Sequence, residues 1–416
     1  MKRLNNPIKF NNEPPIKERK EVNKALVRVK QQAIGRIGLF RGTWENHTQD
    51  PEILDTVDGK GIQLLETPFQ DRIPHIRVQD KETLKREIEK LREQGVVEYA
   101  SHSEGEYISR VFLVKKKDKK EHRLILDLAQ LNDEFIEYRK FKMETLKSIL
   151  TLVTPGCWFY SIDFSDAYYS IPVHESFRKY LRFEVDGILY QYTCMPNGYK
   201  DAPRLFTKLL KVPLAKIRDE VSATIAAYLD DSLGIEQGNK RDLEGIPYKL
   251  IRIFKEFGYT INYDKSVLEL THEIAFLGFL INSLTMRIYM TEKKEKGVKQ
   301  AIEEILGTDG PTIRHLCQVI GKILATMPAN KFARLYTTRA NLLKDLLLNL
   351  YDQDYEKRIT LSEEVIRDFL DQKQRLTGVS SLIFESDPDL ELFSDASNEW
   401  GVFAPFRRDV YIQFGK

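Results

Sequence analysis

The sequence predicts an α+β protein, in which helices and antiparallel strands occupy separate stretches of one chain. An amphipathic helix is expected at Lys81–Gln94, where Leu84, Ile88 and Leu91 recur at helical spacing ahead of Gly95. Elsewhere, alternating strand patterns flank short polar turns, which is typical of hairpins. At roughly 100–200 residues per domain, a chain of 416 residues should form several compact units.

The first half of the chain contains two predicted hairpins. Arg110–Val114 and Arg123–Leu126 flank a turn rich in lysine. Further on, Trp158–Asp163 alternates large and small residues and ends on a carboxylate. Ser222–Tyr228 leads into Asp230 and Asp231, after which a strand resumes at Ser232–Ile235, so the paired aspartates should lie at a hairpin tip.

The remaining elements are predicted from the same patterns. They are a basic helix or arm at Ile16–Ile34, a helix at Tyr248–Phe257, one apolar strand at Ile274–Ile281, a helical block at Thr291–Leu350 with breaks at 307–311 and 328, and short strands within Leu390–Lys416.

Composition excludes several classes of protein. The 22 Phe and 19 Tyr argue against a disordered chain, and the 3 Cys exclude a disulfide scaffold. The cysteines, Cys157, Cys194 and Cys317, match no zinc motif and indicate a reducing compartment. The uncharged stretch Ser148–Ile162 is too short to span a bilayer. With no apolar leader, we expect an intracellular protein, cytoplasmic or nuclear, that is neither secreted nor membrane-bound.

The formal net charge of +2 conceals a marked asymmetry. Met1–Arg41 carries eleven basic and three acidic residues, Arg110–Arg123 seven and two, and Lys293–Asp345 ten and five, whereas Asp352–Glu399 carries thirteen acidic and five basic residues. Basic blocks over the first three quarters are typical of a protein that binds a polyanion, because phosphate contacts depend on local fields. A solvated surface with uneven charge is the alternative.

The aspartates suggest a metal site. Adjacent carboxylates at an apolar hairpin tip repel each other and lose solvation, a cost that bound cations offset. With Asp163, Asp230 and Asp231 would complete a site for two divalent ions, the arrangement used for in-line phosphoryl transfer. Taken alone, an Asp-Asp dipeptide is also common in turns.

Six motifs in order resemble those of reverse transcriptases. They are Val111–Asp118 with Arg123–Leu128, Asp163–Tyr168, Met195–Pro203, Tyr228–Asp231, Gly258–Lys265 and Phe276–Phe279. The resemblance implies a right-hand polymerase with fingers, a ferredoxin-like palm and a helical thumb and connection.

In such an enzyme Asp163 and Asp230 would bind two Mg²⁺ ions, which Mn²⁺ could replace. The Phe164 carbonyl would add an oxygen ligand and Asp231 a supporting carboxylate. Lys265 matches the position expected to protonate the leaving pyrophosphate, although a plain surface lysine is the alternative.

The resemblance also implies a nucleotide site. Lys116 and Arg123 would grip the γ- and α-phosphates of the incoming nucleotide. The amides of Asp166 and Ala167, where the strand turns into a helix, would meet the same triphosphate.

Three side chains bear on substrate choice. A ring at Tyr168 would collide with a 2′-hydroxyl, which implies deoxynucleotides. Asn197 departs from the retroviral pattern, which has Gln there, but can still hydrogen-bond a ribose or phosphate. Asp201 stands where a small residue is usual, which puts retroviral-type details in doubt.

Features after the palm extend the resemblance. Leu277 and Gly278 align with the loop that steadies the primer end, and the basic helical block with a thumb. Asp395 would be the first metal ligand of an RNase H domain whose other carboxylates lie beyond Lys416. We therefore expect no RNase H activity from this chain alone, which would be a fragment or a degenerate copy.

The implied domains follow in chain order. They are a basic extension at 1–75, fingers at 76–138 and 171–201, palm at 139–170 and 202–285, helical thumb at 286–350, connection at 351–388 and a truncated RNase H-like start at 389–416.

Two further motifs resemble those of DIRS-like retroelements, one branch of the elements that encode reverse transcriptases. They are Trp44–Thr48 with Asp50, and Pro311–Leu316 with Ile320-Gly321. Gypsy-like retrotransposons and pararetroviruses are near alternatives.

The expected function is RNA-directed DNA synthesis within a retrotransposon polyprotein. The partners would be a primed RNA or DNA template, dNTPs and other element-encoded proteins, such as an RNase H remainder and a recombinase. Two alternatives remain: an RNA-dependent RNA polymerase, and a catalytically inactive, polymerase-derived nucleic-acid-binding protein. Tyr168 disfavours the first, and the intact aspartates disfavour the second.

Overall fold

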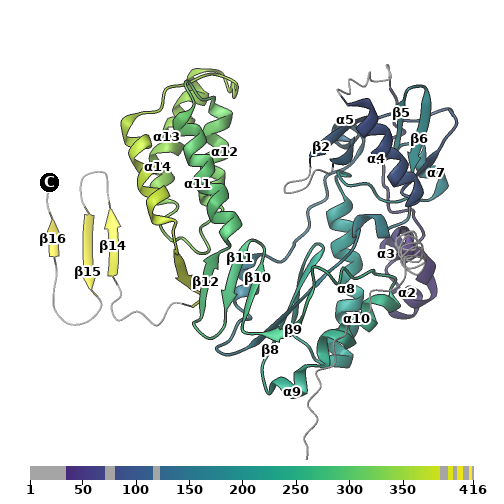
Figure 1. Cartoon of the computed structure of the whole chain (residues 1–416), viewed down its shortest axis with the longest axis horizontal. Helices are drawn as coiled ribbons and strands as arrows, with labels where there is room; N and C mark the ends of the chain where they lie inside the picture. Colours follow the sequence, from purple (N-terminus) through teal and green to yellow (C-terminus); the bar gives the residue numbers. More distant parts are fainter. Residues whose placement is uncertain are drawn as a thin grey trace, which may run out of the picture. The chain divides into compact units, whose positions relative to one another are not determined.

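A computed structural model describes residues 34–70, 80–115 and 122–384, and the backbone of three further strands, β14 (Leu392–Ala396), β15 (Gly401–Pro405) and β16 (Ile412–Phe414). The chain divides into two compact units (Figure 1). Unit 1 comprises 1–145 and 158–271, and unit 2 comprises 146–157 and 272–416. Within both units the named strands pair antiparallel beside numerous helices, which confirms the predicted α+β class.

Unit 1 begins, in its described part, with three short helices, η1 (Arg36–Phe40), α2 (Arg41–His47) and α3 (Pro51–Val57). The side chain of Asp50 caps α3 by accepting from the amides of Glu52 and Ile53. Trp44 is fully buried, and its indole N–H donates to the Phe257 carbonyl over 3.2 Å. These helices are therefore packed into unit 1. The predicted arm at 16–34 falls, except for its last residue, outside the described residues.

A helix and two small sheets follow. The predicted amphipathic helix is α4 (Lys81–Glu93), capped by Asp80. The strands β1 (Val97–Tyr99), β6 (Ile188–Tyr192) and β5 (Arg182–Val185) form one sheet, in that order. The predicted lysine-tipped hairpin is confirmed as β2 (Arg110–Lys115) paired with β3 (His122–Asp127), and its tip lies outside the described residues.

The central sheet of unit 1 has the order β7-β8-β4-β9, with β4 (Trp158–Asp163) between β8 (Asp231–Glu236) and β9 (Val267–Thr271). The outer strand β7 (Ile225–Tyr228) starts later than the predicted Ser222, because Ser222 is left-handed (φ 55°) after α8. Tyr160 packs so closely over Gly234 that a Cβ there would lie 1.9 Å from the ring. Only glycine therefore fits at position 234 beneath the Tyr160 ring.

The helices of unit 1 that pack together near this sheet are α8 (Ala202–Val221) and α10 (Ile246–Glu256), which lie side by side (Figure 1). The shorter helices of the unit are α5 (Ala129–Phe135), η2 (Tyr168–Ser170), α7 (Glu175–Arg178) and α9 (Lys240–Leu243).

Unit 2 corrects one prediction. The run 274–281 is two strands, β10 (Glu273–Phe276) and β11 (Phe279–Asn282), joined at Leu277 and Gly278. Both residues have positive φ, 49° and 80°, which is the turn that matches the twist of a two-residue hairpin. The sheet continues through β12 (Arg287–Met290) to β13 (Ser380–Leu382).

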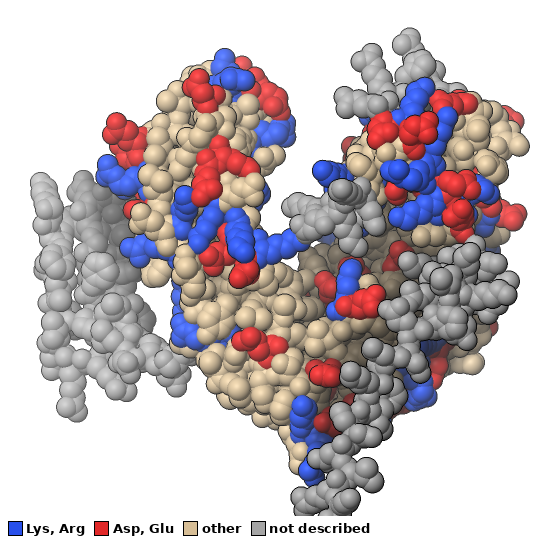
Figure 2. Space-filling view, viewed as in Figure 1, with Lys and Arg blue, Asp and Glu red and all other residues tan. Residues whose placement is uncertain are grey.

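The predicted helical block is confirmed. Its helices are α11 (Glu292–Gly307), α12 (Ile313–Leu324), η3 (Leu335–Thr337) and α13 (Thr338–Leu350), and the unit also holds α6 (Leu146–Leu150) and α14 (Glu363–Arg375). Figure 2 shows basic side chains gathered over α11, whose first turns carry four lysines. Within the described part of the chain, no helix is both long and apolar enough to cross a bilayer.

Candidate active site

The strand register brings the three predicted carboxylate residues together in unit 1. Asp163 is the last residue of β4 and is the Cα partner of Asp231, the first residue of β8. Asp230 lies in the turn before β8, and its carbonyl accepts the Phe164 N–H over 3.0 Å. Leu229 makes this tight turn possible by adopting φ 55°. The predicted hairpin tip is therefore confirmed, and it adjoins the end of β4.

The two paired carboxyl groups are held at an electrostatic cost. Burial raises the pKa of Asp163, and the nearby charge of Asp230 raises it further. Burial, followed by the charges of Asp230 and Asp163, raises the pKa of Asp231 to about 6. Asp163 is only 9% exposed, and its Oδ1 finds no hydrogen-bond partner in the described part of the protein. Acidic groups therefore outnumber the cations at this site.

Lys265 offsets part of this charge. Its Nζ lies 3.6 Å from Asp163 Oδ2 while the lysine side chain stays 67% exposed. The segment that carries Lys265 is fixed to β4, because the Asn262 N–H donates to the Asp163 carbonyl over 2.8 Å and Ser266 Oγ accepts the Asp163 N–H. The structure therefore places Lys265 next to the Asp163 carboxylate.

The residues fit a divalent cation by their chemistry. Buried carboxylates and an unpartnered carboxylate oxygen are the hard ligands that such ions prefer. Across residues 34–70, 80–115 and 122–384, however, no three His, Cys, Asp or Glu side chains are already arranged to hold a metal ion. Asp163, Asp230 and Asp231 adjoin without converging on one point, so binding would require their side chains to turn.

Phe164 and Tyr168 frame the carboxylates. The Phe164 ring is buried and lies 4.9 Å from the Phe254 ring, so only its backbone faces the site. Tyr168 packs edge-to-face on Phe206 at 5.8 Å. Burial first, and then the charge of Asp230, raises the pKa of the Tyr168 phenol to about 12. The predicted sugar-sensing ring therefore lies beside the turn of the paired aspartates and stays neutral.

The predicted triphosphate residues are placed in part. The strand β4 is followed by a single 3-10 turn, η2, instead of the expected helix, because Asp166 adopts φ 50° and Ser170 bonds back to the Ala167 carbonyl. Arg123 is exposed on β3, opposite Val114. Lys116 lies outside the described residues.

Asn197 and Arg123 both act on one tyrosine. Burial raises the pKa of Tyr169, and hydrogen bonding by Asn197 and the positive charge of Arg123 oppose this rise. Since Tyr169 directly follows Tyr168, the structure brings these two predicted nucleotide residues next to the turn after β4.

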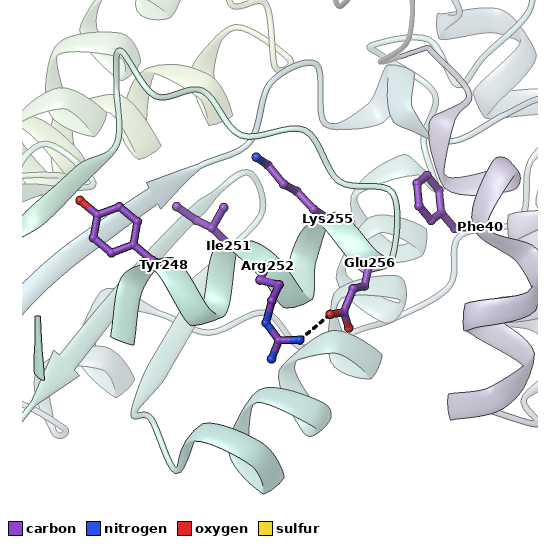
Figure 3. A pocket seen from close by; sticks show the side chains of 6 residues that line it. All are labelled: Phe40, Tyr248, Ile251, Arg252, Lys255 and Glu256. Atoms are coloured by element: carbon purple, nitrogen blue, oxygen red, sulfur yellow. Dashed lines mark hydrogen bonds and ion pairs between the residues drawn. The ribbon is translucent and has the colours of Figure 1, made fainter. Parts of the chain in front are cut away.

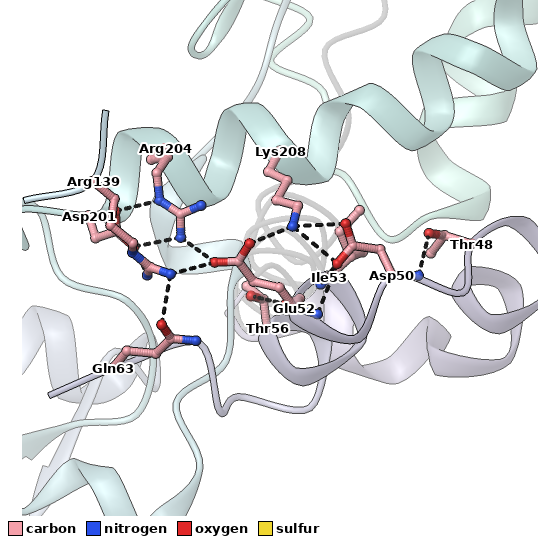
Figure 4. Close-up of polar contacts among 10 residues, drawn as sticks. All are labelled: Thr48, Asp50, Glu52, Ile53, Thr56, Gln63, Arg139, Asp201, Arg204 and Lys208. Carbon is pink, nitrogen blue, oxygen red and sulfur yellow. Dashed lines mark hydrogen bonds and ion pairs between the residues drawn. The ribbon is translucent and has the colours of Figure 1, made fainter. Parts of the chain in front are cut away.

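Sequence reasoning missed an ionic network in unit 1 (Figure 4). Asp201, whose side chain is 3% exposed, accepts from Arg139 and from both Nε and Nη2 of Arg204. Glu52 accepts from the same two arginines and from Lys208. The only signal in the sequence was the unusual acidic residue at position 201, which requires cations when buried. Three cations thus surround these two carboxylates.

The predicted residues of unit 2 occupy two separate elements. Leu277 and Gly278 form the β10–β11 turn, where the Gly278 carbonyl accepts from the backbone N–H and the hydroxyl of Thr291, 3.3 and 3.1 Å away. The turn is thereby tied to the residue that caps α11. Asp395 lies in β14, paired in register with Val402.

An open cavity of about 530 Å³ lies elsewhere in unit 1, along α10 (Figure 3). It is lined by Phe40, Tyr248, Ile251, Arg252, Lys255 and Glu256. None of the predicted site residues lines it. The chemistry of the carboxylates, and not the size of this cavity, therefore marks the candidate site.

Part of the chain is similar to known proteins. Residues 108–281 match the family model described as "Reverse transcriptase (RNA-dependent DNA polymerase)". The Gag-Pol polyprotein of Walleye dermal sarcoma virus is 28% identical over 172 residues, which are 41% of this chain and 10% of that protein. This part of the chain therefore resembles a reverse transcriptase domain of the Gag-Pol type, and the chain spans about a tenth of that curated relative.

Solved structures of a foamy viral protease-reverse transcriptase share the fold. The dRH form in complex with double-stranded DNA has a TM-score of 0.62 and 18% identity, and the match covers 97% of this chain and 68% of that one. The complex with an RNA/DNA hybrid has the same TM-score and identity and covers 96% and 51%. The fold is therefore that of a right-hand polymerase.

Proposed function

We propose that this chain is an RNA-directed DNA polymerase, a nucleotidyltransferase that adds deoxynucleotides to a primer 3′-hydroxyl as part of a longer retroelement polyprotein. The observation that carries the proposal is the meeting of Asp163, Asp230 and Asp231 at the adjoining ends of β4 and β8. These residues lie within the matched range 108–281. Acidic groups that raise one another's pKa are the groups expected where a cation binds.

Two Mg²⁺ ions, or Mn²⁺ in their place, would be held by Asp163 and Asp230, with the Phe164 carbonyl and Asp231 in support. Such ions stabilise charge on a transferring phosphoryl group and activate the attacking oxygen. Lys265 Nζ lies 3.6 Å from Asp163 Oδ2. A lysine that can turn from a carboxylate to a phosphate suits a proton donor to the leaving pyrophosphate.

The chain's own groups would orient the nucleotide. Arg123, with Lys116 from the same hairpin, would grip the triphosphate, and the amides of Asp166 and Ala167 would donate to it. Tyr168 would exclude a 2′-hydroxyl, because its ring is braced on Phe206 and cannot retreat freely.

Asn197 would contact the ribose or a phosphate, a role supported by its place beside Tyr169. Leu277 and Gly278 would steady the primer end, a role supported by the rigid turn that they form. Asp395 would belong to an RNase H-like start.

The partners would be a primed RNA or DNA template and dNTPs. Nucleic acid is supported by the solved relatives, which are complexes with double-stranded DNA and with an RNA/DNA hybrid. The lysines at the start of α11 supply a positively charged surface for backbone contacts. We assign fingers, palm, thumb and connection to the ranges predicted above.

Within the retroelements, we propose a DIRS-like branch. It would work in the cytoplasm or nucleus with other element-encoded proteins, among them a recombinase and the rest of an RNase H. Trp44 and Asp50 lie in the segment that resembles DIRS-like elements. Trp44 is buried and Asp50 caps α3, so this segment is packed into unit 1.

Primer extension tests the proposal. The full chain is incubated with a primed RNA template, dNTPs and Mg²⁺, and compared with Asp230→Asn and with the exposed control Asp242→Asn on α9. We expect extension by the wild type and the control, and a loss of at least about a thousandfold for Asp230→Asn. Equal extension by all three contradicts the role of the aspartates. Preference for ribonucleotides indicates an RNA polymerase, and salt-sensitive binding without extension indicates an inactive binding protein.

A further inference from the structure

We propose that Glu52 is a positioning residue for the nucleotide site: by bridging Arg139 and Arg204, it fixes the loop Pro196–Asp201 that carries Asn197. The inference rests on the proposed polymerase function and deepens it. Glu52 lies on α3, well before the matched range that begins at residue 108. The nucleotide site would therefore depend on a segment outside the family model.

One side of the loop is fixed by α5 and the turn after it. The Asn132 side chain donates to the Gly198 carbonyl over 2.8 Å and accepts the Lys200 N–H over 2.9 Å. Lys200 Nζ donates to the carbonyls of Asn132 and Ile136, both at 2.9 Å. The backbone of Gly198 has φ 98°, a conformation that glycine adopts readily.

On the other side of the loop, the Asp201 side chain is held by ion pairs. Asp201 occupies the position before α8, yet its side chain makes no cap bond to that helix. It is turned instead to the two arginines, with Arg204 Nε and Nη2 at 2.7 and 2.9 Å. Arg139 Nη1 in turn donates to Glu52 Oε1 over 2.7 Å, and Arg204 donates to the same oxygen. Glu52 thus sets where both arginines, and through them Asp201, can lie.

The network is balanced in charge. Asp50, Glu52 and Asp201 face Arg139, Arg204 and Lys208, three acidic groups against three basic ones, with Gln63 as a neutral partner of Arg139 (Figure 4). Arg204 first, and then Lys208, lowers the pKa of Glu52 to about 2, so that Glu52 stays charged at any working pH. Removing this one charge would leave cations in excess around a buried carboxylate.

The loop transmits its position to the site. Met195, just before it, donates its N–H to the Ile171 carbonyl over 2.9 Å, and Asn197 lies close enough to Tyr169 to oppose the rise that burial causes in the pKa of that phenol. Tyr169 directly follows Tyr168 in the chain, and Ile171 lies two residues further on. A shift of the loop would therefore move Asn197 and the turn of Asp166 together, which affects nucleotide binding more than the chemical step at the aspartates.

The test compares Glu52→Gln with Glu45→Gln in the full chain, because Glu45 lies on α2, where it pairs with the partly exposed Arg41. Steady-state primer extension gives KM for the dNTP and kcat, and hydrogen exchange gives the protection of amides 195–201. For Glu52→Gln we expect KM to rise on the order of tenfold with kcat little changed, and loop protection to fall. The double variant Glu52→Gln/Arg139→Gln should recover part of KM, since it restores the charge balance.

Each outcome decides the proposal. Unchanged loop protection in Glu52→Gln overturns it, whether or not the protein extends primers. A parallel loss of kcat in Glu52→Gln, with protection falling across the whole of unit 1, also overturns it by showing a general loss of folding. If the wild type extends no primer but the loop alone loses protection, Glu52 positions the loop and the polymerase function fails. Similar effects of Glu45→Gln would contradict the specificity of the bridge.

Discussion

Glu236 lies buried at the end of β8, far along the strand from the aspartates, with 6% of its surface exposed. Its carboxylate accepts a hydrogen bond from the Tyr160 hydroxyl over 3.1 Å and forms no ion pair within the described part of the chain. Burial therefore raises the pKa of Glu236 to about 7 from the usual 4.5. We predict that Glu236→Gln stabilises the protein above neutral pH.

The sign and size follow from proton linkage. Between pH 4.5 and about 7 the folded chain holds a proton on Glu236 that the unfolded chain has released. The free energy of unfolding then falls as pH rises through this window, and the loss is complete above the folded pKa. A difference of about 2.5 in pKa corresponds to about 3 kcal/mol. Glutamine keeps an oxygen for Tyr160 and carries no charge, so it should recover most of this energy.

The assay is urea unfolding followed by circular dichroism at pH 5 and pH 8. Glu236→Gln should match the wild type within about 1 kcal/mol at pH 5 and exceed it by about 2–3 kcal/mol at pH 8. Exposed Glu244, on the loop before α10, provides the control Glu244→Gln, which should follow the wild type at both values. If the wild type and Glu236→Gln respond to pH in parallel, Glu236 is not held neutral and the reasoning fails.

Three further predictions concern packing and substrate choice. Gly234→Ala places a Cβ 1.9 Å from the Tyr160 ring and should lower the free energy of unfolding by about 3 kcal/mol. Gly245→Ala has open space around it and should leave that free energy unchanged. Thermal melting of both variants tests this difference. Trp44→Phe removes the donor to the Phe257 carbonyl and should cost about 1–2 kcal/mol in urea unfolding, and an unchanged midpoint would contradict the role of that bond. Tyr168→Ala removes the ring braced on Phe206 and should raise the ratio of kcat/KM for ribonucleotides over deoxynucleotides by at least about tenfold, a result refuted if discrimination persists.

The parts of the site that could be predicted are those encoded by local patterns. Asp163 and Asp231 end and begin strands whose alternation is visible in the sequence, so their meeting across β4 and β8 was foreseeable. The β10–β11 hairpin was missed because its turn starts with Leu277, a residue that seldom adopts positive φ and reads as part of an apolar run.

The ionic network could not be predicted in the same way. Glu52 and Arg204 are 152 positions apart, and no periodicity connects residues at such a separation. The one sign in the sequence was Asp201, an acidic residue where a small residue is usual. Its ion pairs with Arg139 and Arg204 explain why a buried carboxylate is stable there. Long-range charge pairing is set by tertiary packing, which the order of residues does not display.

The indole of Trp44 joins the helices near the start of unit 1 to the stretch that matches the family model. Its ring lies 4.9 Å from Phe257 and 6.3 Å from Tyr259, and the Arg36 carbonyl lies so close to Gly258 that a Cβ there would approach it to 2.9 Å. A polypeptide started at residue 108, where the family match begins, would expose this aromatic surface to water and strip Arg204 and Lys208 of Glu52. We therefore expect that a polypeptide able to fold by itself must include the helices before residue 108 as well as the matched range 108–281.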